Sequence, residues 1–229
     1  DFRRFDNDGP DGVPDSGDYD GVVDMVFVNP SSTPSSFLYS EATGISGLGF
    51  ETPYVTGDLG ANGQPIVVAP TQGAIERSRS FAEAVGSMCH EYGHVLGLID
   101  LYNVRYAQRR DGPPKEDSGG IGNWGLMGWG ALGWHGEDGP TALSAFSRAR
   151  LGWPAAAELS AGDQRIWMGP VAAGGAIYRV PLTANEYFLL EYRTRASYYD
   201  RDIPAEGVLI WHVRYQPPAA GQQRGYFVD

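Results

Sequence analysis

The feature that most constrains this chain is the pattern His-Glu-x-x-His at residues 90–94, which lies inside the strongest predicted helix. Ser80 and Glu83 have the spacing of a capping box, so a helix is expected to begin there. Apolar and small residues follow, and Gly97 supplies the stop that commonly ends a helix. The sequence therefore predicts a helix between Ser80 and Gly97 that carries both histidines.

Two histidines four positions apart lie on one face of a helix, about one turn from each other. This separation suits two imidazole nitrogens at about 2.0–2.1 Å from one tetrahedral zinc ion. Glu91 follows the first histidine and points to the side of that face, where it reaches a water on the metal without being a ligand. We predict His90 and His94 as zinc ligands and Glu91 as the catalytic general base.

The chain beyond the helix offers a third ligand. Gly97 allows the backbone to leave the helix in a left-handed conformation, and the chain can then return so that Asp100 presents a carboxylate oxygen. Two histidines and one carboxylate leave the fourth position for water, as a catalytic zinc site requires. In the alternative interpretation Asp100 only orients the loop, and His135 or a later glutamate completes the site.

Several residues outside the motif are assigned more general roles. Met127, in the glycine-rich stretch "GNWGLMGWG", is predicted to place its thioether beneath the zinc site as a soft floor. His135, in a loop beyond it, is a candidate hydrogen-bond donor to the oxyanion of the transition state. His212 is expected to have a structural role in an apolar strand, and Cys89 to be a small buried helix residue.

The charge distribution points to cations and away from nucleic acid. The formal charge is −11, which disfavours nucleic acid and anionic membranes as partners, and no apolar run approaches the roughly 18 residues of a membrane span. Acidic residues are concentrated before residue 25 in a spacing that resembles the first half of a calcium-binding loop. The alternative is a solvated acidic terminus. The predicted calcium ligands are Asp6, Asp8, Asp11, Asp15, Asp18, Asp20 and Asp24.

The remaining patterns predict an α+β fold, because helices and strands are segregated rather than alternating. The length of 229 residues fits one domain, divided into subdomains 1–100 and 101–229, and the chain reads as a piece of a longer precursor. A second helix is expected over residues 140–151. The expected strands are 22–28, 65–69, 165–168, 176–182, 186–193 and 207–213, with a further strand at the last residues, "GYFVD".

Several motifs together resemble the immune inhibitor A family of secreted bacterial metallopeptidases. They are "MCHEYGHVLGLIDLY", "GNWGLMGWG", "EYFLLEYR", "GVLIWHV" and the acidic opening segment. The resemblance implies a zincin catalytic domain of metzincin type, with a mixed sheet, an active-site helix, a Met-turn at Met127 and a β-rich C-terminal part. It also implies secretion, a propeptide in the precursor, zinc, and structural calcium. Some metzincins carry a tyrosine two positions after the Met-turn methionine, where this chain has Trp129, so the oxyanion stabiliser stays open.

The first functional prediction is therefore a secreted zinc endopeptidase that acts on proteins or peptides. Two alternatives remain at this point. One is a zinc hydrolase of non-peptide amides or esters, and the other is a catalytically silent calcium- and zinc-binding module of a larger extracellular protein.

Overall fold

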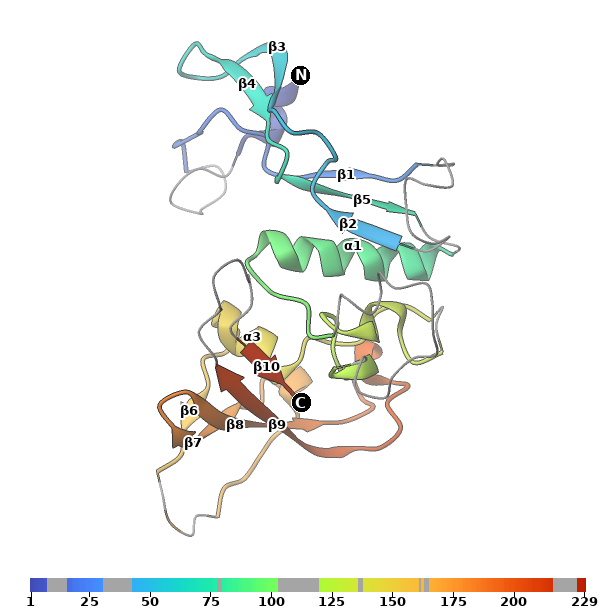
Figure 1. Ribbon diagram of the computed structural model, residues 1–229, viewed down its shortest axis with the longest axis vertical. Coiled ribbons are helices and arrows are strands. Elements are labelled where there is room, and N and C mark those ends of the chain that lie inside the picture. Colours follow the sequence, from blue (N-terminus) through green and yellow to red (C-terminus); the bar gives the residue numbers. More distant parts are fainter. Residues whose placement is uncertain are drawn as a thin grey trace. The chain divides into compact units, whose positions relative to one another are not determined.

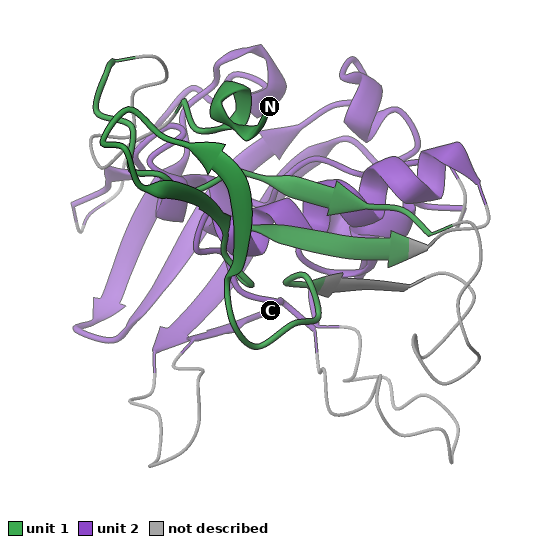
Figure 2. Ribbon diagram, turned by 90° about the horizontal axis from the view of Figure 1, so that it is seen from above, with its two compact units in different colours: residues 1–79 green, residues 80–229 purple. Residues whose placement is uncertain are grey.

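The computed structural model describes residues 1–7, 16–30, 43–77, 80–102, 120–135, 138–160, 162, 165–215 and 226–229. It divides into two compact units, residues 1–79 and 80–229, which Figure 2 shows in green and purple. The division falls ahead of the predicted helix, whereas the sequence analysis placed the subdomain boundary after it. Asp8, Asp11 and Asp15 of the predicted calcium loop lie outside the described residues.

The first unit contains the short 3-10 helix η1 (Phe2–Phe5) and two small sheets. In one sheet β5 (Gly73–Arg77) lies between β1 (Val26–Val28), which is parallel to it, and β2 (Thr43–Ser46), which is antiparallel. The other sheet is the antiparallel pair β3 (Tyr54–Leu59) and β4 (Pro65–Val68). Its buried apolar cluster consists of Val23, Leu48, Ile66 and Val68.

The predicted strands of this unit are partly confirmed. β4 covers most of the expected strand 65–69. The expected strand 22–28 is shorter, because only Val26–Val28 pairs continuously and Val22 makes an isolated bridge to Val67. The apolar run predicted burial correctly, since Val23 is 2% exposed, but backbone pairing needs a partner strand along its whole length.

The second unit begins with α1 (Phe81–Val95), labelled in Figure 1. The Ser80 side chain accepts a hydrogen bond from the Glu83 backbone N–H, as the capping prediction requires. At the other end Gly97 has a φ of +87°, and its N–H bonds to the His94 carbonyl. The helix and both of its ends are confirmed.

Two 3-10 helices, η3 (Gly122–Trp124) and η4 (Trp129–Leu132), lie in the glycine-rich stretch that follows. The second helix, α3 (Ala145–Leu151), begins five residues later than predicted. Ser144 is extended and its side chain accepts from the Ser147 N–H, so this cap sets the start in place of Pro140. Its end is as predicted, since Gly152 has a φ of +74°.

The C-terminal part of the second unit is a five-stranded sheet in the order β10-β9-β8-β7-β6. All neighbouring pairs are antiparallel except β6 and β7. The strands are β6 (Ala157–Glu158), β7 (Tyr178–Thr183), β8 (Glu186–Arg193), β9 (Gly207–Tyr215) and β10 (Tyr226–Val228), with the 3-10 helices η5 (Val171–Ala173) and η6 (Tyr198–Asp200) between them.

Four of the predicted strands of this region are observed, and β8 has the predicted bounds. The strand expected over residues 165–168 is not formed; that segment has no regular structure. Trp167 in it is 84% exposed, so its apolar side chains have no sheet to cover. The core of the unit includes Leu98, Met127, Phe146, Ile177, Leu189, Trp211 and Val213.

Candidate metal centre

Helix α1 brings the two motif histidines together. The His90 and His94 rings are 4.9 Å apart between centroids and nearly perpendicular. His90 is 6% exposed, whereas the side chain of His94 is 20% exposed. One edge of the pair is therefore reachable from solvent, as a metal ligand set needs.

The turn after α1 brings Asp100 to the same point. Gly97 reverses the chain, and the Leu98 N–H bonds back to the Gly93 carbonyl at 2.9 Å. One oxygen of Asp100, Oδ1, lies 3.1 Å from His90 Nε2 and 3.1 Å from His94 Nε2. These three side chains are one of two groups, within the described residues, whose ligand atoms lie within 4.8 Å of one another.

The far nitrogens of both imidazoles are occupied by backbone carbonyls. His90 Nδ1 is 2.8 Å from the Leu126 oxygen, and His94 Nδ1 is 3.1 Å from the Leu98 oxygen. A carbonyl oxygen only accepts, so each Nδ1 carries the proton and donates it. In a neutral imidazole Nε2 is then an acceptor, and it faces another acceptor, the Asp100 carboxylate.

This arrangement fits a metal ion. Acceptors held 3.1 Å apart need a cation between them, either a proton or a metal. Two ligand atoms at 2.0–2.1 Å from a tetrahedral zinc are roughly 3.3 Å apart, close to the separation found here. A histidine that binds a metal usually donates its other N–H to a carbonyl or carboxylate, as both do here. The residues present therefore match the donor set of a catalytic zinc site.

The charges of the site follow from this proximity. Burial by itself would raise the pKa of Asp100, but hydrogen bonds from both histidines lower it well below its usual range. Burial by itself would lower the pKa of His94, and the bond to Asp100 raises it above the ordinary value of 6.5. The centre therefore favours a negative carboxylate and attracts a positive charge to the imidazoles.

Glu91 lies beside these ligands and is 7% exposed. Burial raises its pKa above the ordinary value of 4.5, although the charges of His90 and His94 act in the opposite direction. A raised pKa moves a carboxylate toward the range in which it exchanges protons at neutral pH. The direction of this shift is the one that a general base needs.

Met127 lies beneath the helix. It is fully buried, and a Cβ placed on Gly93 would meet its sulfur at 2.6 Å, so the glycine permits this close approach. The Met127 carbonyl accepts from the Leu101 N–H at 2.7 Å, next to Asp100. The methionine and its loop thus contact both the helix and the turn that carry the candidate ligands.

Other predicted residues lie elsewhere. His135 groups with Asp138 and Asp202, the second set of ligand atoms within 4.8 Å of one another among the described residues. Gly139, next to Asp138, lies beside Ala82, eight residues before His90 in α1 and so roughly 12 Å from it along the helix axis. The oxyanion role of His135 stays a prediction, and the structure adds no contact that favours it.

Two minor predictions have different outcomes. His212 Nε2 is 2.7 Å from Glu186 Oε1 across strands β9 and β8, which agrees with a structural role. Cys89 was expected to be buried and is exposed. Its position one residue before His90 turns it away from the face that carries the ligands.

The acidic loop of the first unit is partly described. Asp6 is 2% exposed and accepts from the Gly21 N–H at 3.3 Å, and Asp24 accepts from the Asn7 N–H at 3.0 Å. Burial and the nearby charges of Asp20 and Asp24 raise the pKa of Asp6. These carboxylates therefore repel one another, although no three of them form a ligand group in the described residues.

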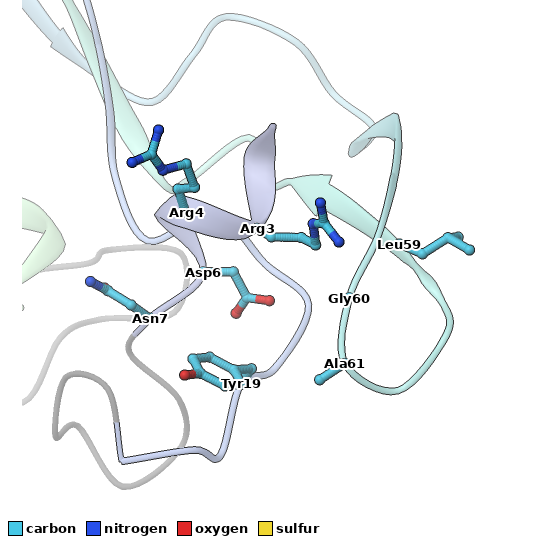
Figure 3. Close-up of a pocket in the computed structure, with 8 residues that line it drawn as sticks. All are labelled: Arg3, Arg4, Asp6, Asn7, Tyr19, Leu59, Gly60 and Ala61. Atoms are coloured by element: carbon cyan, nitrogen blue, oxygen red, sulfur yellow. The ribbon is translucent and has the colours of Figure 1, made fainter.

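Asp6 also borders a cavity of about 350 Å³ in the first unit, shown in Figure 3. In Figure 3 the Asp6 side chain lies between Arg3 and Tyr19, and the Arg4 side chain extends away from it. The cavity contains none of the candidate zinc ligands. Its lining residues are Arg3, Arg4, Asp6, Asn7, Tyr19, Leu59, Gly60 and Ala61.

Sequence reasoning missed two contributions to the metal centre. The Leu126 carbonyl, which orients His90, carries no side-chain signal. Tyr102, whose ring lies 6.1 Å from the His90 ring, was visible in the motif "LIDLY" but was given no role.

No described helix is long and apolar enough to cross a membrane.

Comparison with protein families supports the resemblance noted in the sequence. The model described as immune inhibitor A peptidase M6, catalytic domain, matches residues 74–157. Searches of curated proteins and of solved structures gave no match. The matched segment contains α1, the turn to Asp100, Met127 and α3. Over this segment, which holds every candidate ligand of the metal centre, the chain is similar to the catalytic domain of immune inhibitor A peptidases.

Proposed function

We propose that this chain is the catalytic domain of a secreted zinc endopeptidase, with His90, His94 and Asp100 as the zinc ligands. The observation that carries the proposal is the pair of Nε2 atoms facing one oxygen of Asp100 at 3.1 Å, with both Nδ1 atoms bonded to carbonyls. Met127 is the residue of the Met-turn in this proposal. Protein or peptide substrates follow from the peptidase family.

When bound, zinc supplies an electrophile for the scissile carbonyl and a water whose pKa is lowered to about 7. Glu91 accepts the proton of the attacking water and holds it at a carboxylate oxygen until the leaving amine takes it. The Leu126 and Leu98 carbonyls fix the tautomer of the two histidines, so that each keeps Nε2 for the metal. Burial raises the pKa of Glu91, which is the direction that favours this exchange.

The Glu91→Gln variant tests the proposal. It removes the general base and keeps the shape of the side chain, so we expect zinc content unchanged and casein hydrolysis reduced by about 10²–10⁴-fold. Glu158→Gln is the control, because Glu158 is an exposed residue that pairs with Arg179 on the sheet. A Glu91→Gln protein with full zinc and near-normal hydrolysis would contradict the proposal. Wild-type protein that binds zinc and hydrolyses no protein substrate would favour a silent module or a hydrolase of other amides or esters.

Calcium in the acidic loop, a propeptide and secretion belong to the same proposal; the calcium rests on the spacing of the acidic residues, and the propeptide and secretion rest on the family resemblance. The pKa of Asp6 is raised mainly by burial and further by the charges of Asp20 and Asp24, and this supports the calcium part, because a divalent cation would relieve the repulsion among them.

A further inference from the structure

The second unit buries a group of charged side chains that the proposed chemistry does not use. The side chains of Glu191 and Arg193 on β8 and of Asp200 in η6 have no exposed surface. Arg193 Nε donates to Asp200 Oδ2 at 2.8 Å, and Arg193 Nη2 bonds to the other oxygen. Removing charges from water is costly, and hydrophobic residues of similar volume often stabilise a core as well or better. The stability of the sheet therefore does not by itself account for the burial of these three charged side chains.

Glu191 gathers donors from three elements at one oxygen. Its Oε1 accepts from the Ala145 N–H at 3.2 Å, from Trp211 Nε1 at 2.9 Å and from Arg193 Nη1 at 3.3 Å. These bonds join α3, β9 and β8. Arg193 is thus fixed on two sides, by Asp200 and by a glutamate that is itself anchored.

One more bond leads from this group toward the metal centre. Arg193 Nη1 donates to the carbonyl oxygen of Trp124 at 3.3 Å, at the end of η3. Two residues later the Leu126 carbonyl accepts from His90 Nδ1, and the next residue, Met127, packs against Gly93. Arg193 therefore anchors the start of the segment 124–127, in which the Leu126 carbonyl orients a candidate ligand.

We propose that Arg193, held by Asp200 and Glu191, is a positioning residue of the metal centre. It acts through the segment 124–127 and sets the position of the carbonyl that orients the His90 ring. The inference rests on the proposed function, because it takes His90 as a zinc ligand. Loss of a hydrogen bond to a metal-binding histidine typically lowers metal affinity by 10–100-fold. Arg193 does not bond to His90 itself but to the Trp124 carbonyl, two residues before the carbonyl that does.

The Arg193→Lys variant tests this assignment. Lysine keeps the charge but lacks the planar fork, so it cannot bond to both Asp200 oxygens and to Trp124 at once. We expect zinc binding weakened by about tenfold, the lower end of the range for bonds around a ligand. We also expect an altered visible spectrum of the cobalt-substituted protein, which reports coordination geometry. Both are measured well below the unfolding temperature.

Two control variants separate positioning from general stability. Arg195→Lys changes the same residue type two positions along, where the guanidinium bonds to the Ile203 and Pro204 carbonyls outside the group. Val213→Ala destabilises the core of the same sheet at a fully buried residue whose side chain makes none of the hydrogen bonds of the group. We expect both controls to keep the wild-type cobalt spectrum and zinc affinity. If Arg193→Lys keeps them too, or if Val213→Ala changes them equally, the assignment is overturned.

A measurement on wild-type protein covers the case in which Arg193→Lys does not fold. Zinc bound to His90 is expected to change the bonds of the segment 124–127, and with them the surroundings of Arg193. We expect the Nε–H resonance of Arg193 to shift, or its hydrogen exchange to slow, when zinc is added to metal-free protein. An unchanged resonance and exchange rate would overturn the inference. None of these readouts uses proteolysis, so an active Glu91→Gln protein would refute the proposed chemistry alone, whereas wild-type protein without zinc affinity would refute both.

Discussion

Replacing Gly86 by alanine sets helix propensity directly against packing. Gly86 lies inside α1, where alanine is favoured over glycine by about 1 kcal/mol. A Cβ at this position would stand 1.8 Å from the carbonyl oxygen of Ala131 in η4, and 2.9 Å from its carbon. Carbon and oxygen normally approach no closer than about 3.3 Å. The helix and η4 would therefore have to separate by roughly 1.5 Å, because the Ala131 carbonyl is backbone and a Cβ is fixed to the helix.

The packing cost exceeds the propensity gain. Inserting a methyl group into a close-packed interior costs about 1–3 kcal/mol, and a clash with backbone belongs at the upper end. Subtracting about 1 kcal/mol of propensity leaves the variant less stable by about 2 kcal/mol. Urea unfolding followed by tryptophan fluorescence measures this free energy.

Gly93→Ala in the same helix is the matched control. Its nearest obstacle is the Met127 sulfur at 2.6 Å, the end of a flexible side chain that can move. We expect a smaller loss of stability than for Gly86→Ala, with weaker zinc binding because Met127 moves under the site. A Gly86→Ala protein as stable as wild type, or more stable, would refute the packing argument.

Three further predictions concern the pH dependence of zinc binding, the cap of α1 and calcium. Because Asp100 raises the pKa of His94, the metal-free protein gains stability from protonated His94 below pH 6.5 and loses it as the pH rises through the raised value. Zinc must displace this proton, so the increase in melting temperature caused by zinc should grow between about pH 6 and pH 8, and an increase independent of pH would contradict this. Ser80→Ala should lower the unfolding free energy by about 1 kcal/mol in urea titrations, and an unchanged free energy would argue against the cap. Saturating calcium, at about 100 times its dissociation constant, should stabilise wild type by about 2.7 kcal/mol and Asp6→Asn by much less, and equal melting temperatures with and without calcium would argue against the site.

The features that the sequence predicted well are those that neighbours along the chain decide. The helix from Ser80 to Gly97 depends on a cap and a left-handed glycine, each within one turn of the residues it affects. The same helical spacing places His90 and His94 together. The reversal to Asp100 follows from the glycine and the short distance along the chain. β8 was predicted with its bounds because its alternation is local.

The features that the sequence did not determine depend on partners distant along the chain. Glu191 and Arg193 on β8 are buried together with their partners Asp200, Trp211 and the start of α3. The residue pattern of the strand does not predict these partners. The carbonyl that orients His90 comes from 36 residues away and carries no side-chain signal. The sequence by itself determined the helix and the placing of the candidate ligands on it, because contacts between residues close along the chain suffice for that. The contacts that orient the candidate ligands depend on the tertiary structure. The buried ion pair of Arg193 and the bond from His90 Nδ1 to the Leu126 carbonyl form only when segments distant along the chain come together.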